Sequence, residues 1–289
     1  MITRRQIVGL ALAAALAAPT VAASAERELK AILKRIGGRL GVHALDSQSG
    51  KRFGIDERSR YAMASTMKLP LAAALLWQVD RGAFTLERSL PVARENLLPN
   101  SPMVEAVLAK GESTMTLREL CVAIITVSDN AAANILLTGI GGPAALTTFM
   151  RNIGDEVTRF DRTETSLNSN TPGDPRDTTT PRAMVDSLLR IFTQDVLSIP
   201  SRALLIDWLS AAKTGLERVH AGMPKSWVVG DKTGTGANGA ANDLVIAFPP
   251  QRRPVFVAVY MSGSQLPVAE LNAAHAQIGT LVSKELGRD

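Results

Sequence analysis

Strand-like patterns lie at the two ends of this chain, and a long helical stretch separates them. Residues 39–55 read as two strands joined by a short polar turn. Residues 244–248 and 254–262 read as two further strands around a turn rich in proline and arginine. Between these segments, residues 65–207 follow mostly helical patterns. A single sheet must therefore be assembled from both ends of the chain, with the helical part inserted between them.

We accordingly predict an α/β (α+β) fold of two domains, an antiparallel sheet flanked by helices and an inserted all-helical domain, with the functional site between them. The sheet-and-helix domain is expected to comprise residues 26–61 and 208–289, and the helical domain residues 62–207. The helical domain includes residues 160–180, which are rich in Asp, Asn, Thr and Pro and lack periodicity. A long irregular loop within a compact domain is typical of a functional segment.

The first 25 residues have the pattern of an export signal. Arg4 and Arg5 precede the apolar stretch 7–18, which is too short and too rich in alanine for a membrane span, and Ala23-Ser24-Ala25 resembles a cleavage site. The surroundings of Arg4 also fit a twin-arginine signal, and the choice between this route and an ordinary secretory route stays open. We therefore predict a periplasmic or secreted protein whose mature chain begins near Glu26 and has no membrane span.

Charge, cysteine and histidine usage narrow the function further. The formal net charge is +5, with no basic run and no interleaved aromatic residues, so a nucleic-acid surface is not supported. The single cysteine, Cys121, excludes an internal disulfide and lies in an apolar run, so we expect a buried, unreactive thiol. His43, His220 and His275 fit no zinc-binding spacing, so structural roles are expected and no metal site is predicted.

The motif Ser65-x-x-Lys68 precedes an apolar helical run. A helix that starts at Ser65 places this hydroxyl at the positive end of the helix dipole, with Lys68 one turn on along the same face. A lysine activates a serine only if burial or a neighbouring cation lowers its pKa. Taken alone, the motif is more typical of a helix cap followed by a solvent-exposed lysine.

Ser128-Asp129-Asn130 lies between two apolar helical segments. Asp129 or Asn130 is expected to cap the second helix. A functional interpretation adds two roles, with Ser128 relaying a proton to a leaving nitrogen and Asn130 donating a hydrogen bond to a substrate carbonyl.

The triplet Lys-Thr-Gly occurs twice. Lys213-Thr214-Gly215 ends a helical pattern, so Gly215 is expected to be a C-cap. Lys232-Thr233-Gly234 follows a strand pattern and precedes Thr235-Gly236, and glycines in a strand mark a close approach of another molecule to the backbone. We therefore choose Lys232 as the functional site, where a strand edge aligns a substrate and the Thr235 N–H points at a developing oxyanion.

Glu164 lies in the irregular loop, four residues before Asn168. This spacing allows the two side chains to share one water, and an ionised carboxylate is able to act as a base. Arg162 and Asp177, near the two ends of the loop, are expected to clamp it. Without the other motifs, Glu164 would read as an ordinary solvated loop residue.

Together these motifs resemble those of the class A serine β-lactamases, through nearly the whole mature chain. The stretches that carry the resemblance are Ser65-x-x-Lys68, Ser128-Asp129-Asn130, Arg162-x-Glu164-x-x-Leu167-Asn168, Arg176-Asp177-Thr178-Thr179 and Asp231-Lys232-Thr233-Gly234-Thr235. The resemblance implies the two-domain fold shared by serine β-lactamases and penicillin-binding proteins, and hydrolysis of penicillins and cephalosporins. It also implies no metal or organic cofactor, small-molecule β-lactams as partners, and a monomer.

The resemblance further implies a role for each matched residue. Ser65 attacks the lactam carbonyl, and either Lys68 or Glu164 acting through a water takes its proton. Ser128 passes a proton to the departing ring nitrogen, the backbone N–H groups of Ser65 and Thr235 form the oxyanion hole, and Glu164 activates the water that hydrolyses the acyl-enzyme. Arg218 matches a substrate-binding arginine of some members, with a solvated surface arginine as the alternative. The residues expected to bind substrate are Asn130, Asn168, Lys232, Thr233, Gly234, Thr235 and Arg218.

Three positions depart from the family pattern. Thr165 stands where many members have a proline that follows a cis peptide bond. A non-proline cis bond costs about 3–4 kcal/mol, so we expect a cis Glu164–Thr165 bond that its surroundings hold in place. We also expect the loop to be more mobile than in relatives with the proline. Asn100 replaces an aromatic residue at the site entrance, so one apolar wall is missing. Met67 stands where disulfide-bearing carbapenemases have a cysteine, so no such activity is predicted.

Two other functions stay open. A D-Ala-D-Ala peptidase shares the first, second and last motifs, but Glu164 with Asn168 argues against it because a peptidase needs no device for fast deacylation. A non-hydrolysing β-lactam-binding sensor requires an inactive Glu164 loop, and only Thr165 points in that direction.

Overall fold

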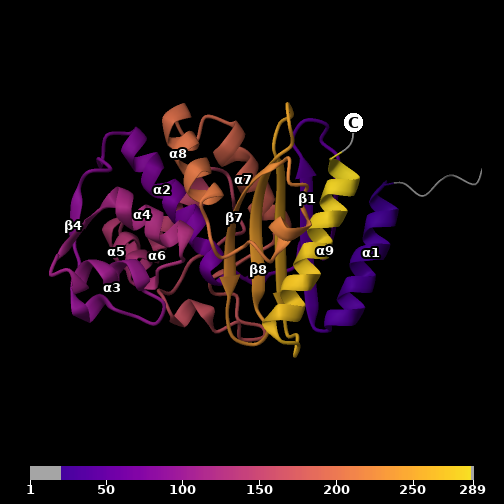
Figure 1. Cartoon of the computed structure of the whole chain (residues 1–289), viewed down its shortest axis with the longest axis horizontal. Helices are drawn as coiled ribbons and strands as arrows, with labels where there is room; N and C mark the ends of the chain where they lie inside the picture. Colours follow the sequence, from indigo (N-terminus) through magenta and orange to yellow (C-terminus); the bar gives the residue numbers. More distant parts are fainter. Residues whose placement is uncertain (1–20, 288–289) are drawn as a thin grey trace, which may run out of the picture.

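The structure, a computed structural model, describes residues 21–287 of the chain. Its centre is a five-stranded antiparallel sheet in the order β2-β1-β9-β8-β7 (Figure 1). The strands are β1 (Arg39–Asp46), β2 (Arg52–Ile55), β7 (Val228–Thr235), β8 (Ala241–Phe248) and β9 (Val255–Ser262). Strands from both ends of the chain thus pair in one sheet, as the sequence pattern predicts, and β7 lies at its edge.

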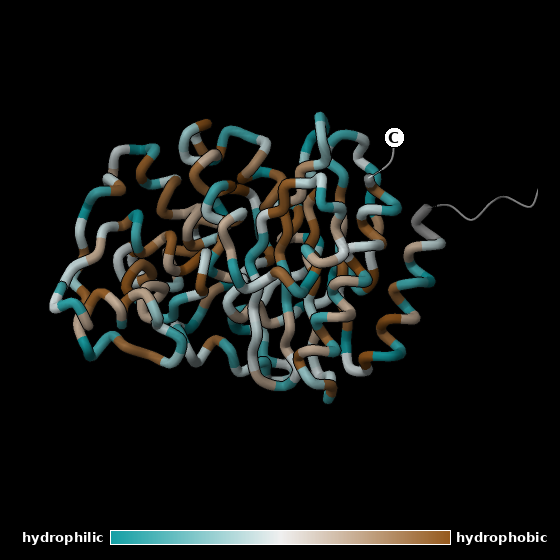
Figure 2. The backbone as a smooth tube through the Cα atoms, viewed as in Figure 1, coloured by the Kyte–Doolittle hydropathy of each residue, from teal (hydrophilic) through white to brown (hydrophobic). Residues whose placement is uncertain are grey.

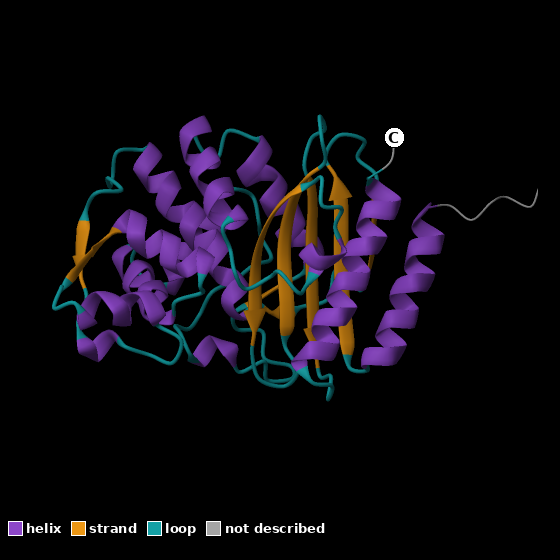
Figure 3. Cartoon of the chain, viewed as in Figure 1, coloured by secondary structure: helices purple, strands orange, loops and turns teal. Residues whose placement is uncertain are grey.

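Strand β9 shows why both faces of the sheet are covered. Its alternate side chains belong to opposite hydrophobic clusters: Val255, Val257 and Val259 pack with the terminal helices, and Phe256, Ala258 and Tyr260 pack with the helical part. Successive side chains of a strand point to opposite faces, so a fully apolar strand requires a layer on each side. Helices α1 (Val21–Ile36) and α9 (Val268–Leu286) form one layer (Figures 1 and 3).

The inserted helical part lies against the other face of the sheet. Its helices are α2 (Lys68–Asp80), α3 (Pro102–Ala109), α4 (Leu117–Thr126), α5 (Asn130–Gly139), α6 (Pro143–Asn152), α7 (Pro181–Thr193) and α8 (Ile199–Ser210). Short ladders pair β3 (Tyr61–Ala62) with β6 (Thr178–Thr179) and β4 (Ser89–Pro91) with β5 (Thr114–Thr116). Short 3-10 turns lie at Ala64–Met67, Arg94–Asn96, Ser166–Asn168 and Val219–Gly222.

Helix α2 occupies the middle of the helical part. Every residue from Lys68 to Leu76 is buried, and a helix that is apolar around its circumference belongs in a core. Figure 2 shows hydrophobic residues concentrated along the inner segments of the helical part and of the sheet. The one charged residue in this buried run, Lys68, therefore has to find its partners inside the protein.

The N-terminal helix begins inside the predicted signal peptide. Its first residue is Val21, five residues before the expected start of the mature chain, and Ala25 is fully buried. The rest of the predicted signal peptide, residues 1–20, lies outside the described residues. Within the described part of the chain, no single helix is long and apolar enough to cross a membrane; only α5 and α6 taken together meet that length and composition, and they are bent by 70°.

Candidate active site

Ser65 lies in the 3-10 turn Ala64–Met67, and Lys68 is the first residue of α2. The predicted helix start at Ser65 is therefore wrong by three residues, but the predicted contact forms, because Lys68 Nζ lies 2.9 Å from Ser65 Oγ. Burial lowers the pKa of Lys68, and the neighbouring Glu164 carboxylate opposes this effect. Lys68 therefore gives up its proton more readily than a solvated lysine, which is the condition for activating Ser65.

The break between α4 and α5 brings a second hydroxyl to this lysine. Asp129 caps α5, because its carboxylate accepts from the Ala132 N–H at 2.9 Å, and the predicted cap is confirmed. Beside it, Lys68 Nζ lies 2.6 Å from Asn130 Oδ1 and 3.2 Å from Ser128 Oγ. The first two motifs thus meet through one ammonium group.

Lys232 reaches the same hydroxyl from the sheet. Its Nζ lies 3.2 Å from Ser128 Oγ and 2.8 Å from the Thr233 carbonyl oxygen. The pKa of Lys232 is lowered to about 7. The largest cause is burial, and the next is repulsion from the nearby charge of Lys68. Two buried ammonium groups, one from each part of the fold, therefore flank Ser128.

The end of β7 lies directly against the Ser65 turn. A side chain at Gly234 would come within 2.7 Å of the Met63 carbonyl oxygen and 3.1 Å of the Ser65 nitrogen, so only glycine permits this approach. Arg218 supports the strand from behind: its Nη1 donates to the Gly234 carbonyl at 3.1 Å and its Nη2 to Thr235 Oγ1 at 2.6 Å. Arg218 is only 4% exposed, so the alternative of a solvated surface arginine is wrong.

Glu164 reaches Ser65 and Lys68 from the loop between α6 and α7. Its Oε1 lies 3.2 Å from Ser65 Oγ and 2.8 Å from Lys68 Nζ, and its Oε2 accepts from Asn168 Nδ2 at 2.6 Å. The Glu164–Thr165 peptide bond is cis, as the sequence comparison predicts. The Asn168 Oδ1 atom is buried and has no hydrogen-bond partner among the described residues.

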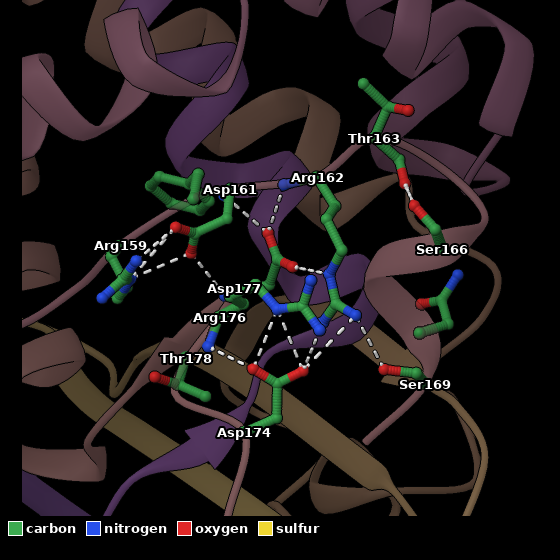
Figure 4. A network of polar contacts seen from close by, with 12 residues as sticks. Arg159, Asp161, Arg162, Thr163, Ser166, Ser169, Asp174, Arg176, Asp177 and Thr178 are labelled. Carbon is green, nitrogen blue, oxygen red and sulfur yellow. Dashed lines mark hydrogen bonds and ion pairs between the residues drawn. The ribbon is translucent and has the colours of Figure 1, made fainter. Parts of the chain in front are cut away.

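The predicted clamp at the neck of this loop is confirmed (Figure 4). Arg162 Nε lies 2.5 Å from Asp177 Oδ2, and Asp177 Oδ1 accepts from the N–H groups of Asp161 and Arg162 at 2.8 and 2.9 Å. Asp177 is buried, so this pair is shielded from solvent screening. Figure 4 also shows the guanidinium groups of Arg162 and Arg176 converging on the carboxylate of Asp174.

Asn134 contacts the site residue Glu164, and the sequence analysis did not identify it. The Asn134 side chain lies on α5, one turn after Asn130, and brackets the backbone of Glu164. Its Nδ2 donates to the Glu164 carbonyl and its Oδ1 accepts from the Glu164 N–H, both at 2.9 Å. Helix α5 thus holds the backbone position from which the Glu164 carboxylate reaches Ser65.

The interpretation of Lys213-Thr214-Gly215 needs correction. The C-cap of α8 is Ala211, so Gly215 does not end that helix; instead, a side chain at Gly215 would collide with the Asp231 carboxylate. The Thr214 hydroxyl accepts from Thr233 Oγ1 at 2.7 Å. The triplet Lys213-Thr214-Gly215 therefore lies next to Lys232-Thr233-Gly234, because the chain that follows α8 runs alongside β7.

A nucleophilic hydroxyl, a buried amine, a buried carboxylate and a cationic strand edge meet at one place. These groups and their spacing define a serine enzyme that works through an acyl intermediate. Among the described residues, no group of three or more His, Cys, Asp or Glu side chains is placed to hold a metal ion.

Comparison with known proteins agrees with this class. Residues 24–286 match the model of the β-lactamase enzyme family. The chain is 40% identical over 275 residues to β-lactamase L2 of Stenotrophomonas maltophilia, covering 94% of this chain and 90% of the relative. It is 41% identical over 252 residues to the carbapenem-hydrolyzing β-lactamase KPC of Klebsiella oxytoca, covering 87% and 85%.

Solved structures show the same relationship. The class A β-lactamase reconstructed as the last common ancestor of Gram-negative bacteria is 50% identical, with a TM-score of 0.88 over 91% of this chain and 99% of that chain. A β-lactamase of Xanthomonas campestris is 38% identical, with a TM-score of 0.90 over 93% and 100%. The chain belongs to the class A β-lactamases, which hydrolyse β-lactams and confer antibiotic resistance.

Proposed function

We propose that this β-lactamase opens penicillins and cephalosporins through an acyl-enzyme on Ser65 that Glu164 helps to hydrolyse. The observation that carries the proposal is the position of Ser65 Oγ, which lies 2.9 Å from Lys68 Nζ and 3.2 Å from Glu164 Oε1. One hydroxyl is thus within reach of an amine and a carboxylate, and either is able to take its proton, the carboxylate directly or through a water.

In the acylation step, Ser65 Oγ bonds to the lactam carbonyl carbon as its proton passes to Lys68 in its neutral form or, when Lys68 is protonated, to Glu164 directly or through a water. The carbonyl oxygen becomes an oxyanion, for which the N–H groups of Ser65 and Thr235 are the donors; losing one such donor typically lowers the rate by about 10²–10³. The carbon–nitrogen bond of the ring then breaks, and the nitrogen takes a proton from Ser128. Ser128 recovers a proton from Lys68, whose Nζ lies 3.2 Å away, and the proton that Ser65 released restores Lys68.

The hydrogen bonds around Ser128 support this last transfer. A hydroxyl has two acceptor sites and one donor. Both acceptor sites of Ser128 Oγ are used by the ammonium groups of Lys68 and Lys232, each at 3.2 Å. Only the O–H donor of Ser128 then remains unused. It is therefore directed away from both lysines and is available to the leaving nitrogen.

The β7 edge supplies the anchor for the substrate carboxylate. Lys232, Thr233 and Thr235 offer the charge and the hydroxyl groups. Gly234 lets the end of this strand lie against the Ser65 turn, and Arg218 donates to Thr235 Oγ1 at 2.6 Å. Asn130 offers its side-chain amide to the acyl carbonyl of the substrate.

Deacylation uses Glu164 and Asn168 to position one water. Asn168 Nδ2 donates a hydrogen bond to Glu164 Oε2. The Oδ1 atom of Asn168 has no partner among the described residues, so it is free to accept one hydrogen of that water. Glu164 takes the other hydrogen as the water oxygen bonds to the ester carbon. The bond between that carbon and Ser65 Oγ then breaks, and the proton returns to Ser65.

The test is intact mass spectrometry of the protein mixed with benzylpenicillin or a chromogenic cephalosporin. The parent protein should turn over repeatedly without an accumulating adduct. Glu164→Gln should accumulate one acyl group on Ser65, and Ser65→Ala should form none. A stable adduct on the parent protein would contradict the proposal and favour the peptidase or sensor.

We further propose export to the periplasm or medium, by a signal within residues 1–25, and a monomeric protein. Edman sequencing of the exported protein tests the first part and identifies the new N-terminus. Light scattering tests the second, and a mass twice that of the chain would overturn it.

A further inference from the structure

A cavity of about 320 Å³ lies between residues 59–62, which precede Ser65, and residues 170–176 in the second half of the loop, and neither Ser65 nor Glu164 lines it. About 10–15 Å³ of such space already holds one water, so there is room for a small solute with its hydration. We call it the arginine cavity because its charged lining consists of Arg39, Arg60, Arg162, Arg176 and Asp174.

Carboxylates neutralise three of the four guanidinium groups. Arg39 pairs with Asp56 at 3.4 Å, Arg162 pairs with Asp177 at 2.5 Å, and Arg176 pairs with Asp174 at 2.9 Å. Asp174 is shared, because Arg162 also lies 3.6 Å from it, and Figure 4 shows both guanidinium groups converging on it. The carboxylates on this side of the loop are thus engaged by these arginines.

Arg60 is the exception. Among the described residues it has no carboxylate within 4.0 Å, and its Nη1 donates to the Val157 carbonyl at 2.9 Å and to Thr178 Oγ1 at 3.0 Å. The other nitrogens of the guanidinium group keep their donors available, in the fork geometry that suits a planar or tetrahedral oxyanion. The four arginines are thus balanced by three carboxylates, Asp174 in the lining and Asp56 and Asp177 outside it, which leaves one positive charge unbalanced.

We propose that the arginine cavity is a binding site for a small multivalent oxyanion of the phosphate class, with Arg60 as its principal ligand. The charge excess excludes a cationic ligand, and the polar lining disfavours an apolar one. A bound oxyanion accepts hydrogen bonds from Arg60 and bridges the segment before Ser65 to the far half of the loop that carries Glu164. The inference stands apart from the catalytic roles proposed above, because none of its residues touches the substrate there.

The test measures the thermal unfolding midpoint of the parent protein with inorganic phosphate, against sodium chloride at equal ionic strength. At ten times its dissociation constant, phosphate should raise the midpoint by about 3–6 °C more than chloride. Arg60→Gln removes the charge and keeps a hydrogen-bond donor, and it should abolish this difference. Arg58→Gln is the matched control, because it removes an exposed arginine two residues away that does not line the cavity, and it should retain the difference.

Two further measurements keep the result unambiguous. If Arg60→Gln does not fold, Arg60→Lys replaces it, and isothermal titration of phosphate should then show one site on the parent protein with several-fold weaker affinity in the variant. Equal midpoints in phosphate and chloride for the parent protein would overturn the proposal. A phosphate effect that persists in Arg60→Gln would overturn the proposal as well, and its displacement by a β-lactam substrate would place the anion in the catalytic site.

Discussion

The contact between Asn134 and the backbone of Glu164 makes a testable link between fold and catalysis. Asn134→Ala removes two hydrogen bonds of 2.9 Å and leaves the Glu164 N–H and carbonyl without their partners. Each lost bond costs about 0.5–1.5 kcal/mol when water replaces the partner, and about 1–3 kcal/mol when nothing does. The Glu164 side chain is buried, but the deleted amide leaves space for water, so we expect the free energy of unfolding to fall by about 2–4 kcal/mol.

The catalytic consequence should be larger for deacylation than for acylation. Misplacing a catalytic group by about 1 Å is able to slow a step about 10²-fold. Lys68 remains at Ser65 in the variant, whereas the water-activating carboxylate loses its fixed backbone. Asn134→Ala should therefore accumulate acyl-enzyme during benzylpenicillin turnover, with a deacylation rate about 10–100-fold below that of the parent protein.

Urea unfolding gives the stability change, and rapid-quench mass spectrometry gives the two rates separately. Thr138→Ala is the control, because Thr138 lies one turn further along α5, is exposed, and makes no side-chain hydrogen bond within the described residues. Loss of stability with an unchanged deacylation rate would refute the catalytic link. An unchanged free energy of unfolding would refute the assigned strength of the two hydrogen bonds.

Three further outcomes follow from the geometry. The pKa of Lys232 is lowered to about 7, and only the protonated form of Lys232 attracts a substrate carboxylate, so kcat/KM should fall as pH rises from 6 to 8. A methyl-ester substrate, which lacks that carboxylate, should show no such decline. Thr214→Val removes the hydroxyl that accepts from Thr233, so KM should rise about 3–10-fold with a smaller change in kcat, and Thr214→Ser should restore it. Asp177→Asn leaves Arg162 without its buried charged partner, so the free energy of unfolding in urea should fall by about 2–4 kcal/mol. The loss should lie at the lower end because Arg162 also contacts Asp174, and a loss below about 1 kcal/mol would contradict the clamp.

Much of the fold was predictable because its elements depend on local pattern. Strand β9 is apolar from Val255 to Met261, which requires cover on both faces, and helix α2 is apolar around its circumference, which requires burial. The spacing of Ser65 and Lys68 is short enough for the 3-10 turn and first helical turn to fix their contact. The Asp129 cap was likewise set by neighbouring residues.

The contacts made across long stretches of sequence were not predictable from local pattern. Glu164 meets Lys68 at 2.8 Å only because the whole helical part folds between them, and the family resemblance, not spacing, pointed to that pairing. Gly215 was mistaken for a helix cap because a Gly after an apolar helical run usually is one. Its true constraint is the Asp231 carboxylate on β7, and nothing near Gly215 in the sequence signals that neighbour.

Asn134 differs from Gly215, because the sequence did contain a signal for the role of Asn134. Asn130 and Asn134 are four residues apart in a helix whose other members near the site are Ala, Ile and Leu. Residues at that spacing share a helix face, and an amide on the packed face of an apolar helix has to find a hydrogen-bond partner from another segment. Once Asn130 is assigned to a site, the partner of Asn134 belongs to the wall of the same site. One helix face thus holds Asn130 against Lys68 and Asn134 against Glu164, which fixes the amine and the carboxylate relative to each other.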